Sequence, residues 1–211
     1  MKDCFSGENL TCVRGNSCVF TELFFSVKSG EGLILKGANG SGKSSLLRLM
    51  TGLLKPIDGE IKWNEKNVLH TTEEHNKRFQ FVGHINPIKP VFTVYENILF
   101  WSQLREKDPR IEYSLNLFGI SHLRDVSCHF LSSGQIRLTN LARIAATSAN
   151  IWLLDEPASS LDQGALENLE KAIRDHQHDG GIVIASTHTK IEIQNAHELL
   201  LSEFLPNRVS Q

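Results

Sequence analysis

Cysteine is scarce in this chain, and the spacing of the few that occur is uninformative. The four cysteines, Cys4, Cys12, Cys18 and Cys128, include no pair with the two-residue spacing of a zinc or redox motif. A disulfide framework would be sparse for a chain of 211 residues. The sequence therefore predicts a protein of a reducing compartment.

An excess of basic residues is also missing. The 22 lysines and arginines stand against 24 aspartates and glutamates, which gives a net charge of -2 and an isoelectric point near 6.5. Domains that bind nucleic acid usually carry a basic face and an isoelectric point above about 9. We therefore expect no nucleic-acid partner.

Long hydrophobic runs are absent as well. The longest apolar stretches, such as residues 33–35 and 182–185, are far shorter than the about 18 residues that a membrane span needs. The polar N-terminal residues also lack the apolar core of a signal peptide. We expect a protein that is not exported, and any membrane span would have to come from a partner.

The remaining composition is that of an ordinary globular protein, with 40% hydrophobic and 22% charged residues. At about 150 residues per domain, the length predicts a single domain over residues 1–211. A helical subdomain, at approximately residues 86–148, is expected as an insertion within it.

Hydrophobic periodicity and turn residues locate the elements of an α/β fold. Residues 18–20, 23–27 and 32–36 are expected to form an antiparallel β lobe, and residues 44–54 a helix. A capping-box pattern at Thr93 and Glu96 predicts a helix to about residue 104, and a further helix is expected at about 110–119.

Strand, helix and strand then follow one another. Residues 151–154 form a continuous apolar run, as in a strand buried on both faces, and residues 182–186 form another. Residues 163–178 between them have helical spacing, with Asp162 as the N-cap. This order predicts a parallel crossover.

A phosphate-binding pattern, G-x-x-x-x-G-K-S/T, spans residues 37–44 between an expected strand and an expected helix. Glycines let backbone N–H groups surround a phosphate, while a lysine reaches the β and γ phosphates and a hydroxyl binds Mg²⁺. The candidate ATP-binding residues here are Gly37, Ala38, Asn39, Gly40, Ser41, Gly42, Lys43, Ser44 and Ser45.

Two acidic residues, Asp155 and Glu156, stand where the 151–154 strand ends. A phosphate loop needs a second anchor for Mg²⁺, so we assign the metal to Ser44 and Asp155. The next carboxylate, that of Glu156, can polarise the water that attacks the γ-phosphate. These residues together predict a P-loop nucleotide hydrolase.

Small residues at 131–135 precede a helical stretch at 136–146. Such residues commonly cap a helix, and they also form anion sites from backbone N–H groups and a hydroxyl. The segment alone does not show whether it is only a helix cap or also an anion site.

Taken in order, these elements resemble the nucleotide-binding subunits of ATP-binding cassette (ABC) transporters over essentially the whole chain. Residues 131–135 are similar to the family's L-S-G-G-Q signature, with Ser133 replacing a glycine. The resemblance makes residues 160–162 the D-loop and His188 the switch histidine, which we count with Lys43 and Glu156 as catalytic. It also implies that two copies sandwich two ATP molecules, the P-loop of one copy facing the signature of the other. The nucleotide contacts that it adds are Ser132, Ser133, Gly134, Gln135 and Asp162.

Two positions depart from the general family pattern. The usual glutamine of the Q-loop is replaced by His84, and the usual aromatic residue that stacks on adenine is replaced by Arg14. A guanidinium can still stack on a base through its flat face. We keep both as candidate nucleotide contacts.

Further segments, including residues 12–15, 83–89, 96–101, 151–157 and 176–181, resemble the ATP-binding subunit of the cytochrome c maturation system. That resemblance implies an integral membrane partner and a peripheral location on the cytoplasmic face of the bacterial inner membrane. The coupled step would be haem export or release of haem from a haem chaperone complex. Ile136 and Asn140 depart from this subfamily's pattern.

Other functions stay open at this stage. They are a transport ATPase for another cargo, a cassette ATPase acting on DNA or ribosomes, and a regulatory module that binds nucleotide without hydrolysis. We expect no direct haem ligation: the pairs His70 and His75, and His176 and His178, are interpreted as solvated. The three tryptophans and the cluster Phe20, Phe24 and Phe25 are interpreted as core, and exposed apolar residues are expected near residues 84–105.

Overall fold

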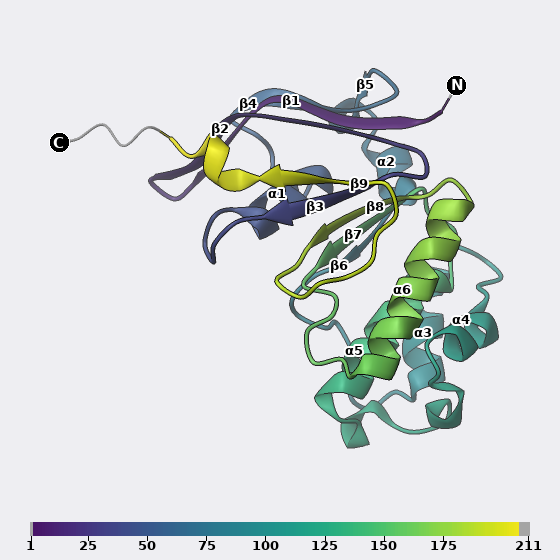
Figure 1. Cartoon of the computed structure of the whole chain (residues 1–211). Helices are drawn as coiled ribbons and strands as arrows, with labels where there is room; N and C mark the ends of the chain where they lie inside the picture. Colours follow the sequence, from purple (N-terminus) through teal and green to yellow (C-terminus); the bar gives the residue numbers. More distant parts are fainter. Residues whose placement is uncertain (1, 207–211) are drawn as a thin grey trace.

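Two β-sheets lie one above the other in the computed structural model, which describes residues 2–206 (Figure 1). The upper sheet is antiparallel, with the order β2-β1-β4-β5. Its strands are β1 (Cys4–Arg14), β2 (Ser17–Lys28), β4 (Asp58–Trp63) and β5 (Lys66–Asn67). The two short strands expected at 18–20 and 23–27 are therefore one continuous strand, in which Glu22 has a positive φ of 53°.

The lower sheet is parallel, with the order β6-β7-β8-β3-β9. Its strands are β6 (Phe79–Val82), β7 (Ile151–Asp155), β8 (Ile182–Ser186), β3 (Gly32–Lys36) and β9 (Ala196–Leu200). The assignment of residues 32–36 to the antiparallel lobe was wrong, because β3 pairs with β8 and β9. Spacing along one strand reveals its pleat but not its partner, which is chosen by packing far along the chain.

Alternate residues of the parallel strands face two separate cores. In β7, Ile151 and Leu153 pack with the antiparallel sheet and α1 (Lys43–Met50), whereas Trp152 and Leu154 pack with the helices on the other face. The central strands are buried along their whole length. This double burial confirms the parallel crossover and the expected α/β fold, with a small antiparallel lobe and a helical layer.

The remaining helices are α2 (Thr72–Arg78), α3 (Val94–Gln103), α4 (Ile111–Leu117), α5 (Ser133–Ala145) and α6 (Gln163–His178). Helices α3, α4 and α6 begin within about one residue of their predicted starts, α5 begins three residues before its predicted start at residue 136, and α2 was not predicted. The capping box at Thr93 is present, and the Asp162 carboxylate accepts the Ala165 N–H at 2.8 Å. α1 stops at Met50 because the chain turns at Gly52, where φ is +76°.

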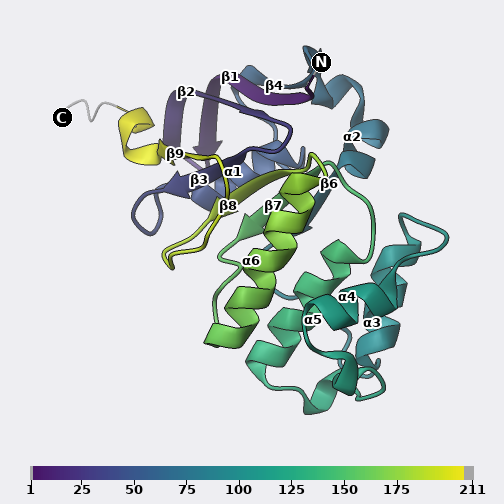
Figure 2. The same cartoon turned by 45° about the vertical axis from the view of Figure 1, so that its right-hand side comes forward.

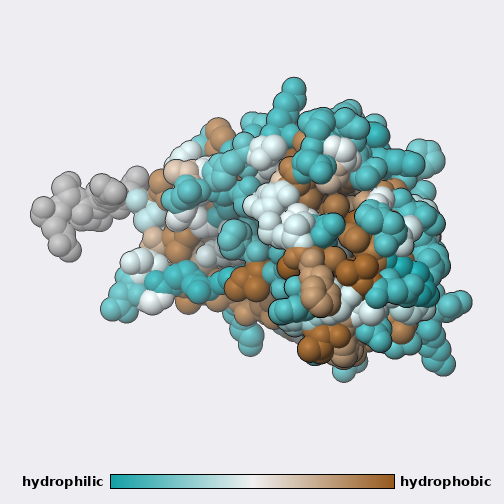
Figure 3. Space-filling view, turned by 90° about the horizontal axis from the view of Figure 1, so that it is seen from below, coloured by the Kyte–Doolittle hydropathy of each residue, from teal (hydrophilic) through white to brown (hydrophobic). Residues whose placement is uncertain are grey.

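Helices α3, α4 and α5 group together beside α6, below the sheets in the view of Figure 2. Seen from below, this part of the molecule shows several hydrophobic patches between hydrophilic ones (Figure 3). Within and beside it, the large apolar residues with exposed side chains are Ile85, Val91, Phe100, Leu104, Tyr113 and Phe130. Four of these lie at residues 84–105, as expected.

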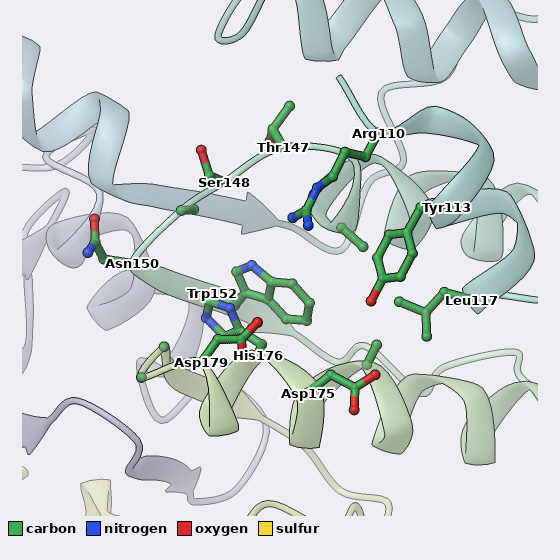
Figure 4. A pocket seen from close by; sticks show the side chains of 15 residues that line it. Arg110, Tyr113, Leu117, Thr147, Ser148, Asn150, Trp152, Asp175, His176 and Asp179 are labelled. Atoms are coloured by element: carbon green, nitrogen blue, oxygen red, sulfur yellow. The ribbon is translucent and has the colours of Figure 1, made fainter. Parts of the chain in front are cut away.

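Three burial predictions were wrong. Phe24 is 65% exposed, because strand alternation buries Phe25 and turns Phe24 outward onto Phe204. His75 and His176 are not solvated: the His75 ring is buried and bonded to the Met50 carbonyl, and His176 stacks on Trp152 at 4.1 Å between ring centroids (Figure 4). Burial lowers the pKa of His176 to about 4.

His176 and Trp152 line a cavity of about 260 Å³, together with Arg110, Tyr113 and Leu117 (Figure 4). All four cysteines are free. Among residues 2–206, no helix combines the length and the apolar character that crossing a membrane requires.

Candidate functional site

The phosphate loop joins the end of β3 to the start of α1, and its glycines are required by its shape. Gly37 and Gly42 have positive φ values of 151° and 103°. A Cβ at Gly37 would lie 2.5 Å from the Ser41 hydroxyl, and one at Gly42 would lie 2.5 Å from a Val19 methyl. The loop is therefore too tight for side chains at these positions, so the backbone itself lines the space in front of α1.

Lys43, the first residue of α1, folds back over this loop. Its ammonium donates to the carbonyls of Gly37 at 2.7 Å and Ala38 at 3.1 Å, and only 8% of the residue is exposed. The positive group therefore sits inside the turn, beside the positive end of the α1 dipole. The two together give this end of the sheet a cationic, anion-accepting character.

Asp155 and Glu156 lie at the carboxyl end of β7, next to the phosphate loop. Asp155 is 5% exposed and accepts the Ser186 hydroxyl from β8 at 2.6 Å. The backbone turns at Glu156, whose φ of 49° is unusual for a side chain other than glycine. Because of this turn, the two carboxylates have different surroundings although they are adjacent in sequence.

His188 connects the two sides of the site. Its Nε2 lies 3.0 Å from Asn39 Oδ1, 3.4 Å from the Lys43 ammonium and 3.5 Å from Glu156 Oε1. Its backbone N–H also donates to Glu156 Oε2 at 3.2 Å. One imidazole thus contacts both the phosphate loop and the turn formed by Asp155 and Glu156, here called the acidic turn. The two are more than a hundred residues apart in sequence.

These groups surround a cavity of about 660 Å³. The predicted residues that line it are Arg14, Asn39, Gly40, Gly42, Lys43, Ser44, Ser45, His84, Asp155, Glu156 and His188. Gly37, Ala38 and Ser41 shape the loop from behind rather than lining the space. The two positions that depart from the family pattern, Arg14 and His84, therefore face the same cavity as the phosphate loop.

The signature segment lines a second hollow, of about 380 Å³. Ser132 and Gln135 form a capping box at the start of α5, each bonding the other's backbone N–H at 2.9 and 3.2 Å. A Cβ on Gly134 would lie 2.8 Å from the Ser160 carbonyl. Within the described residues, none of the signature residues lines the phosphate-loop cavity. The second hollow is lined by Ser132, Ser133, Gly134, Gln135, Leu138, Ser160, Leu161, Asp162 and Ala165.

Sequence reasoning missed three residues that hold these parts together: Ser186, Asn86 and Arg137. Ser186 binds Asp155, and Asn86 accepts from both Arg137 and Asn140 at 2.9 and 2.8 Å. Asn140 departs from the subfamily pattern, and this hydrogen bond explains how a polar side chain is accommodated at a fully buried position. No local pattern could reveal these contacts, although an arginine and an asparagine three residues apart on one helix hinted at a polar, internal face.

Comparison with known proteins agrees with this geometry. Residues 20–159 match the family model described as ABC transporter. The cytochrome c biogenesis ATP-binding export protein CcmA of Paramagnetospirillum magneticum is 42% identical over 205 residues, which cover 95% of this chain and 94% of that protein. The protein of the same name from Rhodospirillum rubrum is also 42% identical, over 96% of this chain and 88% of that protein.

Solved structures agree on the fold. A putative ABC transporter ATP-binding protein from Pyrococcus furiosus superposes with a TM-score of 0.82 at 22% identity, covering 96% of this chain and all of that one. The chain belongs to the ABC transporter family, as an ATP-binding subunit related to the cytochrome c biogenesis ATP-binding export proteins.

Proposed function

We propose that this chain is the ATP-hydrolysing subunit of a membrane ABC complex for c-type cytochrome biogenesis. The main observation behind the proposal is that Asn39, Lys43 and Glu156 each lie within 3.5 Å of His188 Nε2. All four residues line the same open cavity. The relatives named for cytochrome c biogenesis supply the biological process.

The residues of the cavity have separate roles in the proposed reaction. Lys43 and the N–H groups of the loop bind the β and γ phosphates of ATP, and Arg14 stacks on the base. Glu156 accepts a proton from the attacking water, and His188 holds its carboxylate in place through the backbone bond at 3.2 Å. Water attacks the γ-phosphorus, the bond to the β-phosphate oxygen breaks, and ADP and phosphate leave.

We assign Mg²⁺ to the Ser44 hydroxyl and the Asp155 carboxylate. Both line the cavity and both offer oxygen, which is the ligand atom that this ion prefers. When bound, the ion neutralises charge on the β and γ phosphates. The Ser186 hydroxyl, 2.6 Å from Asp155 Oδ1, orients the carboxylate for that purpose.

A second copy of the chain supplies the other half of the ATP site. This proposal is supported by the position of the signature residues, which do not line the phosphate-loop cavity of their own chain in the described structure. In the proposed dimer, Ser132, Ser133, Gly134 and Gln135 of one copy face the ATP held by the other. Asp162 stays at the rim of the signature hollow, as the N-cap of α6.

The membrane partner is an integral subunit of the cytochrome c maturation system, with this chain at the cytoplasmic face of the bacterial inner membrane. The exposed apolar residues of the helical section, with Ile85 and Val91 each 83% exposed, offer it a contact surface. ATP hydrolysis then drives haem export or the release of a haem-loaded chaperone. His84, between the cavity and this section, can report the state of the nucleotide to the partner.

Complementation tests this function directly. A bacterium that lacks its own cytochrome c maturation ATPase subunit would express this chain with its cognate membrane subunit, and haem-stained c-type cytochromes would be measured. We expect the wild-type chain to restore them and Glu156→Gln to fail. A complex that assembles and hydrolyses ATP yet restores no cytochrome would assign the ATPase to another cargo.

A further inference from the structure

Arg137 is the charged residue of the site with the most hydrogen bonds, and the proposed reaction gives it no role. It lies on α5, two residues after Gln135 of the signature segment, and is only 3% exposed. Its guanidinium makes five hydrogen bonds: to the carbonyls of Asp155 (2.9 Å), Glu156 (2.8 Å), Pro157 (3.3 Å) and Gly83 (2.9 Å), and to Asn86 Oδ1 (2.9 Å).

These bonds hold the acidic turn in an unfavourable shape. Glu156 has a backbone in the left-handed region, a strained conformation for a residue with a side chain, which persists only when neighbouring groups hold it. Arg137 binds the carbonyls on both sides of that residue and its own carbonyl as well. The planar, five-donor guanidinium suits this task, because its fork can meet several acceptors in fixed directions.

The same side chain also holds the segment that carries His84. Arg137 Nη1 bonds residues on both sides of His84, Gly83 and Asn86, and Asn140 one turn further along α5 bonds Asn86 too. The acidic turn and the His84 segment are thus attached to one helix, whose first turn is the signature segment.

All of these acceptors are carbonyl or amide oxygens rather than a paired carboxylate. A buried charge without an ion partner is costly unless its N–H groups are bonded, so breaking even one bond is expensive. Burial also lowers the pKa of this guanidinium, although the nearby carboxylates of Asp155 and Glu156 oppose the shift. The arrangement is therefore rigid, and it favours a single relative position of the three segments.

We infer that Arg137 is a positioning residue that fixes the Glu156 turn and the His84 segment relative to the signature helix, so that a shift of α5 moves both. This inference rests on the proposed ATPase function. Arg137 would then connect α5, the helix proposed to contact a second copy, with Glu156, the carboxylate proposed to activate water.

Substitution of Arg137 by lysine tests the inference in the assembled membrane complex. Arg137→Lys keeps the charge but has three donors on one nitrogen, which cannot bond the acidic turn and the His84 segment together. Because misplacement of a catalytic group by about 1 Å costs on the order of 10²-fold, we expect kcat to fall about 10- to 100-fold. The KM for ATP should change less than about threefold, because Lys43 and the loop are untouched.

Arg143→Lys is the matched control. Arg143 is also an internal arginine of α5, bonded to the Phe81 carbonyl at 2.8 Å and Asn140 at 3.3 Å, but it does not touch the acidic turn. Its kcat should stay near wild type. An equal fall of kcat in both variants, or wild-type kcat in Arg137→Lys, would overturn the inference.

A second variant decides the matter if Arg137→Lys does not assemble. Asn86→Ala removes the acceptor that Arg137 and Asn140 share and leaves the acidic turn attached, so kcat should fall by about three- to tenfold with KM unchanged. Wild-type kcat in that variant would count against the inference. A wild-type complex that does not hydrolyse ATP would instead overturn the proposed function, and the inference with it.

Discussion

The two halves of the proposed ATP site are built in opposite ways. The phosphate-loop half gathers Asn39, Lys43, Glu156 and His188 from distant parts of the chain and joins them by direct contacts. The signature half is a local helix start, in which Ser132 and Gln135 cap each other across three residues. The comparison teaches that the first half depends on long-range contacts within one chain, whereas the second half needs only hydrogen bonds within one turn of a helix.

Loss of the loop cation should have the largest effect on the phosphate-loop half. Lys43→Ala removes the only charged side chain of residues 37–44, so we expect ATP turnover by the assembled complex to be abolished, measured as phosphate release. Lys36→Ala is the control, since Lys36 precedes the loop and pairs with Glu198 on β9 at 3.5 Å. Near-wild-type turnover in Lys43→Ala would contradict the assigned role of this residue.

Glu156→Gln should separate binding from chemistry in the same half. Glutamine keeps the size of the side chain but cannot take a proton, and loss of a general base costs about 10² to 10⁴ in rate. We expect Mg-ATP binding to persist and a closed dimer to accumulate in size-exclusion chromatography. The exposed Glu167→Gln on α6 is the control. Unchanged hydrolysis in Glu156→Gln would assign water activation to another residue.

The signature half should be sensitive to one methyl group. In Gly134→Ala the new Cβ would lie 2.8 Å from the Ser160 carbonyl, so the backbone of the hollow must shift. We expect kcat of the assembled complex to fall about tenfold while each isolated subunit still binds ATP. Gly164→Ala is the control, because its Cβ meets Asp162 at an ordinary 3.7 Å. Equal activity of the two variants would show that this hollow does not contact nucleotide.

The smallest expected effect lies away from both halves, at His176. Its folded-state pKa, about 4 rather than 6.5, means that the unfolded chain binds the proton first as the pH falls. The free energy of unfolding should therefore decrease from about pH 6.5 to about 4, with a loss of about 2 kcal/mol at about pH 5.

Urea unfolding at about pH 6.5 and at about pH 5 measures this loss of stability. His176→Phe keeps a ring on Trp152 but cannot titrate, so its stability should fall less with pH than that of wild type. His178→Gln, whose parent side chain is 90% exposed, should behave like wild type. Equal pH dependence in wild type and His176→Phe would locate the titration elsewhere.

Much of the fold was predictable because its signals are local. The capping box at Thr93, the Asp162 N-cap and the apolar strands β7 and β8 all depend on hydrogen bonds or burial patterns within a few residues. The resemblance to ABC subunits then supplied roles for Ser133, Asp162 and His188. Family membership followed from comparison and not from geometry alone.

The other elements were not predictable in this way. Strands β1, β4 and β9 lack strong periodic signals, and β3 was assigned to the wrong sheet, because the choice of a partner strand depends on the whole assembly. The burial of His176 was missed for the same reason, since its stacking partner Trp152 comes from another part of the chain.

The sequence by itself determined where this chain is proposed to bind phosphate, because a glycine loop, a lysine and a helix start are consecutive and need no distant partner. Only the tertiary structure decided what stands around that loop. His188 reaches Asn39 across 149 residues, and Arg137 reaches Gly83 across 54. Contacts of this kind arise because the parallel sheet aligns the carboxyl ends of strands that are remote in sequence, and no local pattern records which ends will meet.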